Sequence, residues 1–555
     1  MMVKLSGRSA FLKLLIDEGV THLFGNPGTT ELPLMEVVPD FPELNYVLGL
    51  QEAVVVAMAD GYARASNRLA ACSLHVAPGL GNAMGALYNA KFSGSPLIVT
   101  AGQQEQGHGL LEPLLYDPLV PIAQPMVKWA VEVTRAEDLP RIVRRAAKLA
   151  LTPPTGPVFI SLPGDVLDAE VELDFGKPTR VDIRVRPSDE VLAQLAAKLL
   201  ESRNPVILAG QELSIHDAFA EAAELAELLG AAVYQQPIPY CAQFPSAHPA
   251  YLGALTRNQK QVRAALAPFD LMLCLGADLL RMSVYSPLSP LPEGMPVVHI
   301  SERDWELGKN YPTELALRAN VKETLRALLP LLRGRRTQAL GEEAGRRLAA
   351  LKLRNWTVQR GEARAEVMQA AQTTPIDPRY LMLRIGETLP QDAVVVEEAV
   401  TSSASLAGFL PLRDPKCFYG LASGGLGFGL PGAVGISLAQ PGRPVVAVVG
   451  DGSAMYGVQA LWTAAHLKLA IIYVIVNNRS YRILKERLVS MRATDRFTGM
   501  DLRDPGIDFT GLARSLGVPA ERVTDPEGIV PALRAALQAG SPRLIEVMVA
   551  DGFGS

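Results

Sequence analysis

Short apolar segments alternate with amphipathic segments along almost the whole chain. HLFG (22–25), LAACSLHV (69–76) and PLIVTAG (96–102) are typical of buried strands, whereas QEAVVVAMADGYARA (51–65) has helical spacing. The same pattern predicts further strands at 45–50, 157–163, 205–210, 231–236, 270–277, 296–301, 392–399, 443–453, 469–478 and 542–550. Because strands and helices alternate, we expect parallel sheets that are covered by helices on both faces.

Two stretches interrupt this alternation. Residues 165–190 are charged and contain proline, which indicates a linker, and residues 335–375 are charged and helix-prone without a strand signal. The sequence therefore predicts an α/β protein with three doubly wound parallel-sheet domains. The predicted boundaries are 1–183 for the first domain, 184–340 for the middle domain, 341–374 for a helical linker and 375–555 for the third domain.

Composition and charge exclude several classes of protein. The 555 residues are 48% hydrophobic and 20% charged, which suits several domains with large cores. The 53 Lys and Arg are scattered among 57 Asp and Glu, so we expect no nucleic-acid partner. Residues 1–19 are predicted to be an amphipathic helix rather than a signal peptide, and no apolar run reaches the ~18 residues of a membrane span. We therefore expect a soluble, cytoplasmic protein with no membrane partner.

The four cysteines do not suggest chemistry. Cys72, Cys241, Cys274 and Cys417 lie far apart in the sequence and form no CxxC pair. This spacing gives neither a disulfide framework nor a zinc site, so the four thiols are predicted to be reduced and mostly buried.

The strongest chemical signal lies at residues 444–481. A buried strand leads into Gly450-Asp451-Gly452-Ser453, a helix follows, and a second buried strand ends at Asn477-Asn478. Adjacent parallel strands end at the same edge of a sheet, so Asp451 and Asn478 can converge on one ion. Carboxylate and amide oxygens suit Mg²⁺, and glycines before a helix suit a diphosphate. A simple tight turn is the alternative, but the strand–turn–helix–strand order disfavours it.

This segment resembles the diphosphate and metal motif of thiamine diphosphate-dependent enzymes, in which GDG is followed further along the chain by NN. The resemblance implies a pyrimidine-binding domain first, a middle domain second and a diphosphate-binding domain last. It also implies thiamine diphosphate and Mg²⁺ as cofactors. Asp451, Asn478 and the backbone oxygen of Ser480 would bind Mg²⁺, while Gly452, Ser453 and Tyr481 would contact the cofactor.

Glu52 follows a predicted strand and lies one residue into a helix. Taken alone, it would be a surface residue that the helix dipole stabilises. Its segment, LGLQEAVVVAMADGYARAS, resembles the cofactor-activating segment of the same family. The resemblance implies that Glu52 protonates the aminopyrimidine of the cofactor, and that it does so from the opposite subunit. A homodimer is therefore the expected minimal active unit, and a homotetramer the expected assembly.

Other segments resemble benzoylformate decarboxylases within that family, among them FGNPGTTELPL (24–34), SLHVAPGLGNAMGALYNA (73–90) and SGGLGFGLPGAVG (423–435). The resemblance implies that Thr29 holds the substrate carboxylate and that His75 is catalytic, although a buried structural imidazole remains an alternative for His75. The remaining implied site residues are Gly424 and Leu426 at the cofactor, and Leu114, Leu115, Ser283, Gly420, Ile483, Leu484 and Arg487 at the substrate pocket.

Several positions depart from the decarboxylase pattern. Segment 275–288 has no histidine where those enzymes carry a second catalytic one, and Ser283 lies nearest to that position. His108, in a glycine-flanked loop, is either a substitute or an exposed loop residue. Gly420 and Arg487 replace pocket aromatics, which weakens the case for benzoylformate itself. Arg487 is either solvated or paired with an acidic substrate, since a guanidinium binds a carboxylate well.

These features favour the non-oxidative decarboxylation of a 2-oxo acid to an aldehyde and CO₂. A carboligase or synthase similar to acetolactate synthase is the alternative, because a missing proton-transfer group favours reaction with a second carbonyl. Such synthases often bind FAD in the middle domain, but LAGQEL (208–213) lacks the glycine pattern of a dinucleotide site. A non-catalytic assembly protein that binds the cofactor is a third alternative, which the intact Glu52, Asp451 and Asn478 disfavour.

Overall fold

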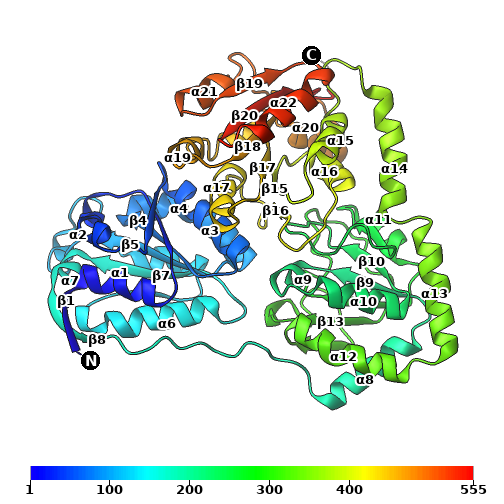
Figure 1. The fold of residues 1–555 in the computed structure, drawn as a ribbon, viewed down its shortest axis with the longest axis horizontal. Helices are drawn as coiled ribbons and strands as arrows, with labels where there is room; N and C mark the ends of the chain where they lie inside the picture. Colours follow the sequence, from blue (N-terminus) through cyan, green and yellow to red (C-terminus); the bar gives the residue numbers. More distant parts are fainter. Residues whose placement is uncertain (1, 554–555) are drawn as a thin grey trace.

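The computed structural model describes residues 2–553, which form three α/β domains. Figure 1 shows the first domain in blue and cyan, the middle domain mostly in green and the third domain from yellow to red. Each domain is built on a six-stranded sheet whose paired strands all run parallel, so the predicted fold class is confirmed. Among the described residues, no helix combines the length and the apolar character needed to cross a membrane.

The first sheet has six strands and is covered by helices on both faces. Its order is β3 (Asn45–Leu48), β2 (His22–Gly25), β4 (Ala70–His75), β5 (Leu97–Gln103), β7 (Val158–Pro163) and β6 (Ala130–Glu132). Helices α1 (Gly7–Asp17) and α6 (Leu139–Leu151) share one core with this sheet, and α3 (Glu52–Ser66) and α4 (Val76–Ser93) share the other. The shorter helices are α2 (Leu32–Val37), α5 (Leu119–Ala123) and α7 (Gly164–Asp168). The face of the sheet that α3 and α4 cover packs towards the third domain, because residues of both domains share one apolar cluster.

The N-terminal segment departs from the prediction. Residues Met2–Ser6 form strand β1, which pairs antiparallel with β8 (Glu170–Asp174), and the helix begins only at Gly7. The predicted helix over 1–19 is therefore wrong for residues 2–6, while Met1 lies outside the described residues. Val3 and Leu5 alternate with exposed neighbours, as expected for a strand. The predicted linker over 165–190 likewise contains most of α7 (Gly164–Asp168), all of β8 and the start of a helix at Asp189, so only residues 175–188 lack regular structure.

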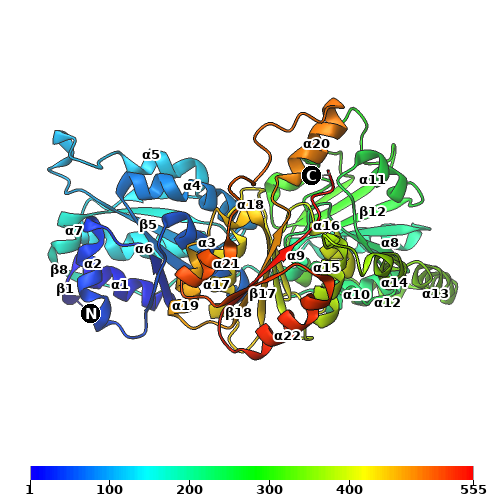
Figure 2. The ribbon, with the colours of Figure 1, turned by 90° about the horizontal axis from the view of Figure 1, so that it is seen from above.

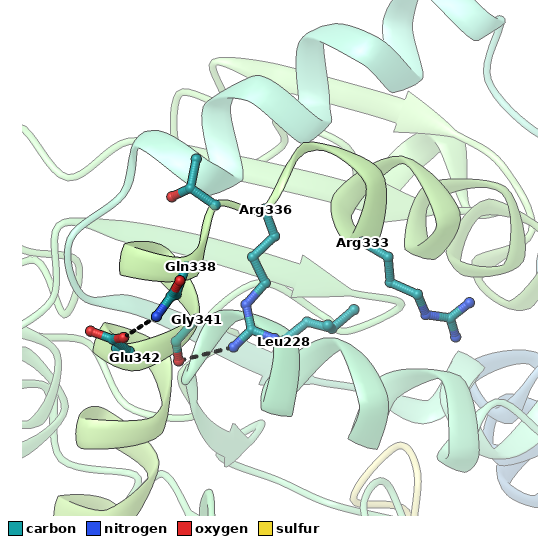
Figure 3. Close-up of a pocket in the computed structure, with 7 residues that line it drawn as sticks. Leu228, Arg333, Arg336, Gln338, Gly341 and Glu342 are labelled. Atoms are coloured by element: carbon teal, nitrogen blue, oxygen red, sulfur yellow. Dashed lines mark hydrogen bonds between the residues drawn. The ribbon is translucent and has the colours of Figure 1, made fainter.

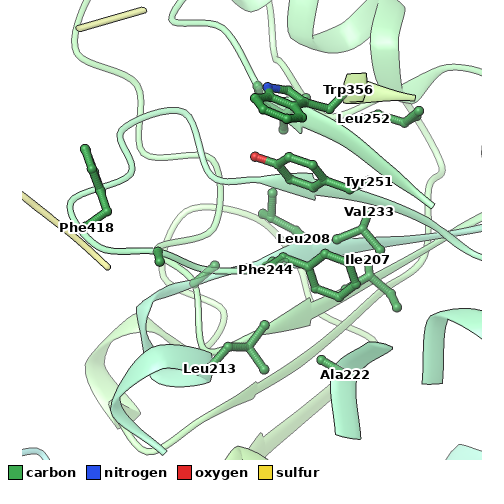
Figure 4. Packing of buried hydrophobic residues seen from close by; sticks show 14 of the residues in the cluster. Ile207, Leu208, Leu213, Ala222, Val233, Phe244, Tyr251, Leu252, Trp356 and Phe418 are labelled. Atoms are coloured by element: carbon green, nitrogen blue, oxygen red, sulfur yellow. The ribbon is translucent and has the colours of Figure 1, made fainter. Parts of the chain in front are cut away.

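The middle sheet is covered by its own helices, and the helical linker packs beside them, against α10 (Phe219–Leu229) and the edge strand β11 (Tyr251–Ala254). Its order is β11 (Tyr251–Ala254), β10 (Ala232–Gln235), β9 (Pro205–Ala209), β12 (Leu271–Leu275), β13 (Val297–Ser301) and β14 (Leu315–Arg318). Its helices are α8 (Asp189–Glu201), α9 (Gln211–Ile215), α10 (Phe219–Leu229), α11 (Gln259–Leu266) and α12 (Val321–Arg335). In Figure 4, Leu208 and Val233 of this sheet belong to one apolar cluster with Trp356 of α14 (Trp356–Val367) and Phe418. Together with α13 (Gln338–Lys352), α14 runs along the outer edge towards the third domain (Figure 1).

The strand order of the third sheet reverses at one point in its interior. The order is β16 (Phe418–Gly420), β15 (Val394–Glu398), β17 (Val445–Gly450), β18 (Ile471–Asn477), β20 (Arg543–Met548) and β19 (Ala520–Val523). Its helices are α15 (Pro378–Thr388), α16 (Ser403–Phe409), α17 (Gly429–Ala439), α18 (Asp451–Ala454), α19 (Ala460–His466), α20 (Arg482–Arg492), α21 (Phe509–Ser515) and α22 (Ile529–Gln538). The reversal lies between β15 and β17, where open parallel sheets bind ligands at the carboxyl ends of the strands.

Two helices join the first and third domains. Helix α3 packs against α17 so closely that a Cβ on Gly435 would lie 1.9 Å from the carbonyl oxygen of Met58. A Cβ on Gly61 would lie 2.3 Å from the carbonyl oxygen of Gly432. Figure 2 shows the two helices side by side at the centre of the molecule. Glycine at these positions therefore fixes how the two predicted cofactor-binding domains meet.

Candidate active site

Asp451 begins helix α18 directly after strand β17. In the sheet, Gly450 lies opposite Val476, so Asp451 faces the end of the neighbouring strand β18. The backbone N–H of Gly452 donates to Asp451 Oδ1 at 2.8 Å, and the N–H groups of residues 478–480 face the same carboxylate. Burial raises the pKa of Asp451 to about 6, against the effect of these N–H groups. The two halves of the predicted metal motif therefore do lie together.

The oxygen atoms at this corner suit a hard divalent cation. Within the described chain, the buried atoms Asp451 Oδ2 and Ser480 Oγ have no hydrogen-bond partner. Asn477 donates its amide to the buried Glu546 at 2.7 Å, whereas Asn478 Oδ1 accepts from the Ser480 N–H at 2.9 Å. A buried carboxylate oxygen is costly when it has neither a donor nor a cation beside it. The residues present therefore fit Mg²⁺, with Asn478 rather than Asn477 as the amide ligand.

Gly452 and Tyr481 are in close contact beside this corner. A Cβ on Gly452 would lie 2.5 Å from Cε1 of Tyr481, so only glycine fits beneath the ring. Ser453, the next residue of α18, is buried. The predicted diphosphate residues thus surround Asp451, on the segments that follow β17 and β18.

A turn that carries Gly424 and Leu426 lies at the end of the next strand. Glu398, the last residue of β15, accepts hydrogen bonds from the N–H of Gly427 at 2.6 Å and from that of Gly429. Gly424 and Gly427 have φ values of +86° and +109°, which favour glycine. Burial raises the pKa of Glu398 to about 8. Sequence reasoning missed Glu398, although a glutamate pair that ends the apolar strand VVVEE was a signal.

Glu52 is the first residue of α3 and its side chain is buried. The surface interpretation of this residue is therefore wrong. Its Oε1 accepts from the amide of Asn26 at 3.2 Å, and its Oε2 accepts from the amide of Asn82 at 3.0 Å. The side chain of Gln51 caps the helix and accepts from the N–H of Val54 at 3.1 Å. Asn26 and Asn82, which sequence reasoning did not single out, thus orient the carboxylate.

His75 lies at the end of β4 and is held by a buried carboxylate. Its Nδ1 lies 2.9 Å from Oε2 of Glu31 and 3.1 Å from Oγ1 of Thr30. Glu31 also accepts from the N–H of Gly28 at 2.9 Å and from that of Gly102 at 2.8 Å. Nδ1 therefore donates to a carboxylate, which leaves Nε2 as the atom for proton exchange. Sequence reasoning missed Glu31, because its partners at residues 75 and 102 are distant along the chain.

Most of the predicted substrate-pocket residues are exposed or half-buried in the single chain. Thr29, Leu114, Ser283 and Leu484 are exposed, Leu115 is 38% exposed, and Ile483 and Arg487 are half-buried. Gly420 is buried, and its N–H donates to the carbonyl oxygen of Tyr240 at 2.8 Å. His108 lies in an exposed loop.

Two surface cavities occur elsewhere, in the middle domain and at its connection to α13. One, of about 590 Å³, is lined by Leu228, Arg333, Arg336, Thr337, Gln338, Gly341 and Glu342 (Figure 3). The other, of about 630 Å³, is lined by residues 263, 289, 291–297 and 311–314. Neither contains a predicted site residue, so both lie outside the candidate active site.

Comparison with known protein families assigns all three domains. Residues 5–112 match the N-terminal TPP binding domain of thiamine pyrophosphate enzymes, residues 192–328 their central domain, and residues 399–547 their C-terminal TPP binding domain. The chain belongs to the thiamine pyrophosphate enzyme family. The predicted family is thus confirmed, and the two TPP binding domains are the ones that contain Glu52 and Asp451.

Individual relatives place the chain within the thiamine pyrophosphate enzymes. Benzoylformate decarboxylase of Pseudomonas aeruginosa is 35% identical over 552 residues, which cover 97% of this chain and 98% of that protein. A probable acetolactate synthase large subunit of Methanocaldococcus jannaschii is 28% identical, covering 98% of this chain and 92% of that protein. The solved thiamine diphosphate-dependent 4-hydroxybenzoylformate decarboxylase of Rhodococcus jostii RHA1 is 34% identical with a TM-score of 0.88, covering 98% and 99% of the two chains. The resemblance to benzoylformate decarboxylases is therefore confirmed.

Proposed function

We propose that this protein is a Mg²⁺- and thiamine diphosphate-dependent decarboxylase that converts a 2-oxo acid to an aldehyde and CO₂. The observation that carries the proposal is the pair formed by His75 and the buried Glu31. Release of an aldehyde requires a proton at the reacting carbon, and an oriented imidazole can deliver one near neutral pH. The similarity to two benzoylformate-type decarboxylases supports the same reaction.

The third domain holds the cofactor in this proposal. When bound, thiamine diphosphate supplies the electron sink that allows the carboxylate of a 2-oxo acid to leave. Asp451, Asn478 and the backbone oxygen of Ser480 hold Mg²⁺, and Gly452, Ser453 and Tyr481 surround the diphosphate. Gly424 and Leu426 orient the aminopyrimidine, and Glu52 holds a proton at its ring nitrogen.

The first domain and α20 handle the substrate. The hydroxyl of Thr29 binds the substrate carboxylate, and His75 exchanges a proton at the reacting carbon through Nε2. The apolar residues Leu114, Leu115, Ile483 and Leu484 exclude water from the pocket, while Ser283, Gly420 and Arg487 complete its lining. The charged Arg487 suits a substrate that carries a second acidic group.

A second copy of the chain completes the site. Glu52 lies on the first domain against Gly79 of α4, whereas the residues proposed to hold Mg²⁺ and the diphosphate lie on the third domain. The first domain also exposes Leu110 by 92% and Leu111 by 74%. Clustered exposed leucines are typical of a surface that a partner covers. In the proposed homodimer, Glu52 of each subunit serves the cofactor of the other, as the family resemblance implies, and two dimers form the tetramer.

Product analysis on a panel of 2-oxo acids tests the reaction. The protein is incubated with thiamine diphosphate, Mg²⁺ and acids that range from pyruvate through branched and aromatic acids to 2-oxoglutarate, with and without an added aldehyde. We expect an aldehyde and CO₂ as the main products. A hydroxyketone as the main product would instead identify a carboligase, which the absence of histidine from segment 275–288 favours. Preference for 2-oxoglutarate would support a carboxylate-binding role of Arg487.

Glu31→Gln is expected to lower kcat about 10- to 100-fold while thiamine diphosphate affinity stays unchanged. The two carboxylate oxygens of Glu31 accept from the N–H groups of Gly28 and Gly102 and from His75 Nδ1. Glutamine has only one acceptor oxygen, so its NH₂ group can take the position to which His75 Nδ1 donates. Aldehyde formation and cofactor titration are measured in parallel, with Thr30→Ser as the control that keeps a hydroxyl beside His75. An unchanged kcat would contradict the role given to the Glu31–His75 pair.

A further inference from the structure

The turn before Leu426 is held by one side chain of the first domain. Asn89, on helix α4, is buried, and its Oδ1 accepts from the N–H of Ala422 and from the N–H and Oγ of Ser423, each at 3.1 Å. The Oγ of Ser423 in turn accepts from the N–H of Gly425 at 3.1 Å. The Asn89 oxygen thus binds two consecutive residues of the turn, and Arg281 adds a hydrogen bond from its guanidinium to the carbonyl oxygen of Ala422 at 3.2 Å.

The amide of Asn89 is itself held by a fully buried carboxylate. Its Nδ2 donates to Oδ2 of Asp60 at 2.8 Å, and Asp60 is 0% exposed. Oδ1 of Asp60 accepts from the hydroxyl of Ser93 at 3.0 Å and from that of Ser95. Asp60 has no ion-pair partner among residues 2–553, and its carboxylate is satisfied by hydroxyl and amide donors.

The carboxylate determines which way the amide points. Both carboxylate oxygens of Asp60 act as acceptors, Oδ1 from the hydroxyls of Ser93 and Ser95 and Oδ2 from the NH₂ group of Asn89, so the NH₂ group faces Asp60. The carbonyl oxygen of Asn89 then points to the turn, where three donors need an acceptor. An amide turned the other way would place NH₂ against the N–H groups of Ala422 and Ser423. Asp60 and Asn89 therefore specify a single arrangement of residues 422–425.

We infer that Asp60 and Asn89 are positioning residues for the cofactor. They fix the turn that carries Gly424 and Leu426, so that the carbonyl and side chain assigned to the aminopyrimidine are in place before the cofactor binds. The inference rests on the cofactor contacts of the proposed function. It also gives helix α3 two roles, because Glu52 and Asp60 lie on the same helix, two turns apart.

Cofactor affinity tests the inference with a matched pair of variants. Asn89→Ala and Ser93→Ala each remove one donor from Asp60, but only Asn89→Ala releases the turn. We expect Asn89→Ala to raise the Kd for thiamine diphosphate with Mg²⁺ at least about 10-fold, and Ser93→Ala to change it less than about 2-fold. Both should lower the Tm of the apoprotein. Equal effects of the two variants on Kd, or none, would overturn the inference.

Ser423→Ala tests the same link from the turn, and it applies even if Asn89→Ala does not fold. Alone it should raise the Kd about 3- to 10-fold. Added to Asn89→Ala it should have a smaller effect than alone, because the hydrogen bond from Ser423 to Asn89 is already lost and only the one from Gly425 to Ser423 remains to be removed. Additive effects would contradict the inference. Near-ultraviolet circular dichroism of the bound cofactor should change in both single variants but not in Ser93→Ala. Because affinity rather than turnover is measured, inactivity on every 2-oxo acid would refute the proposed decarboxylation and leave this result intact.

Discussion

Asp451→Asn is expected to weaken Mg²⁺-dependent binding of thiamine diphosphate at least about 100-fold. Asparagine has the same size, so the fold of the segment after β17 should persist, but the negative charge is lost. Asp451 Oδ2 is a buried carboxylate oxygen without a partner among the described residues, which makes it the strongest candidate ligand. Without that charge, the amide of Asn478 and a backbone carbonyl are too weak to retain the ion.

The measurement is a calorimetric titration with thiamine diphosphate, carried out with Mg²⁺ and again after its removal with EDTA. The wild-type protein should lose affinity on metal removal, and Asp451→Asn should show the same weak affinity under both conditions. Asp501→Asn is a matched control. Asp501 also lies beside Ser480, but its carboxylate accepts from Lys485, so the variant removes the same charge without removing a proposed metal ligand. Wild-type affinity in Asp451→Asn would contradict the metal site.

The central strands could be predicted from sequence, whereas most edge strands could not, with β3, predicted at 45–50, as the exception. Central strands such as β17 are buried on both faces and appear as continuous apolar runs. At the sheet edges, β19 has the sequence AERV and β6 only three residues, so neither gives a clear pattern. Strand β1 pairs with β8, from which more than 160 residues separate it, and local periodicity contains no information about such a partner.

The same distinction applies to the candidate site. Asp451 and Asn478 could be predicted to converge because one strand–helix–strand unit determines where both lie. Glu31, Glu398 and Asn89 act through donors that belong to distant segments. The glutamate pair that ends VVVEE is a signal for Glu398, but Glu31 and Asn89 are ordinary residue types at their positions. Their roles follow only from the tertiary packing that brings these segments together.

Glu52→Gln is expected to lower kcat about 10²- to 10⁴-fold while thiamine diphosphate still binds with an affinity close to that of the wild type. The substitution preserves the size of the side chain but removes the acidic proton that the cofactor requires. Steady-state aldehyde formation and cofactor titration are compared with those of Glu43→Gln, which changes an exposed glutamate of the same domain. Full activity would contradict the assignment, whereas lost cofactor binding would indicate a structural role.

Mixed dimers of Glu52→Gln and Asp451→Asn subunits show in which chain Glu52 acts. If it serves the partner's cofactor, one site combines the intact Asp451 of the first subunit with the intact Glu52 of the second. The other site carries both substitutions. The mixed dimer, purified through two different affinity tags, should then regain about half of the wild-type activity, although each parent is inactive. If Glu52 serves its own chain, each site carries one substitution and the mixed dimer stays inactive. Recovery of activity therefore requires that α3 completes the site of the opposite subunit.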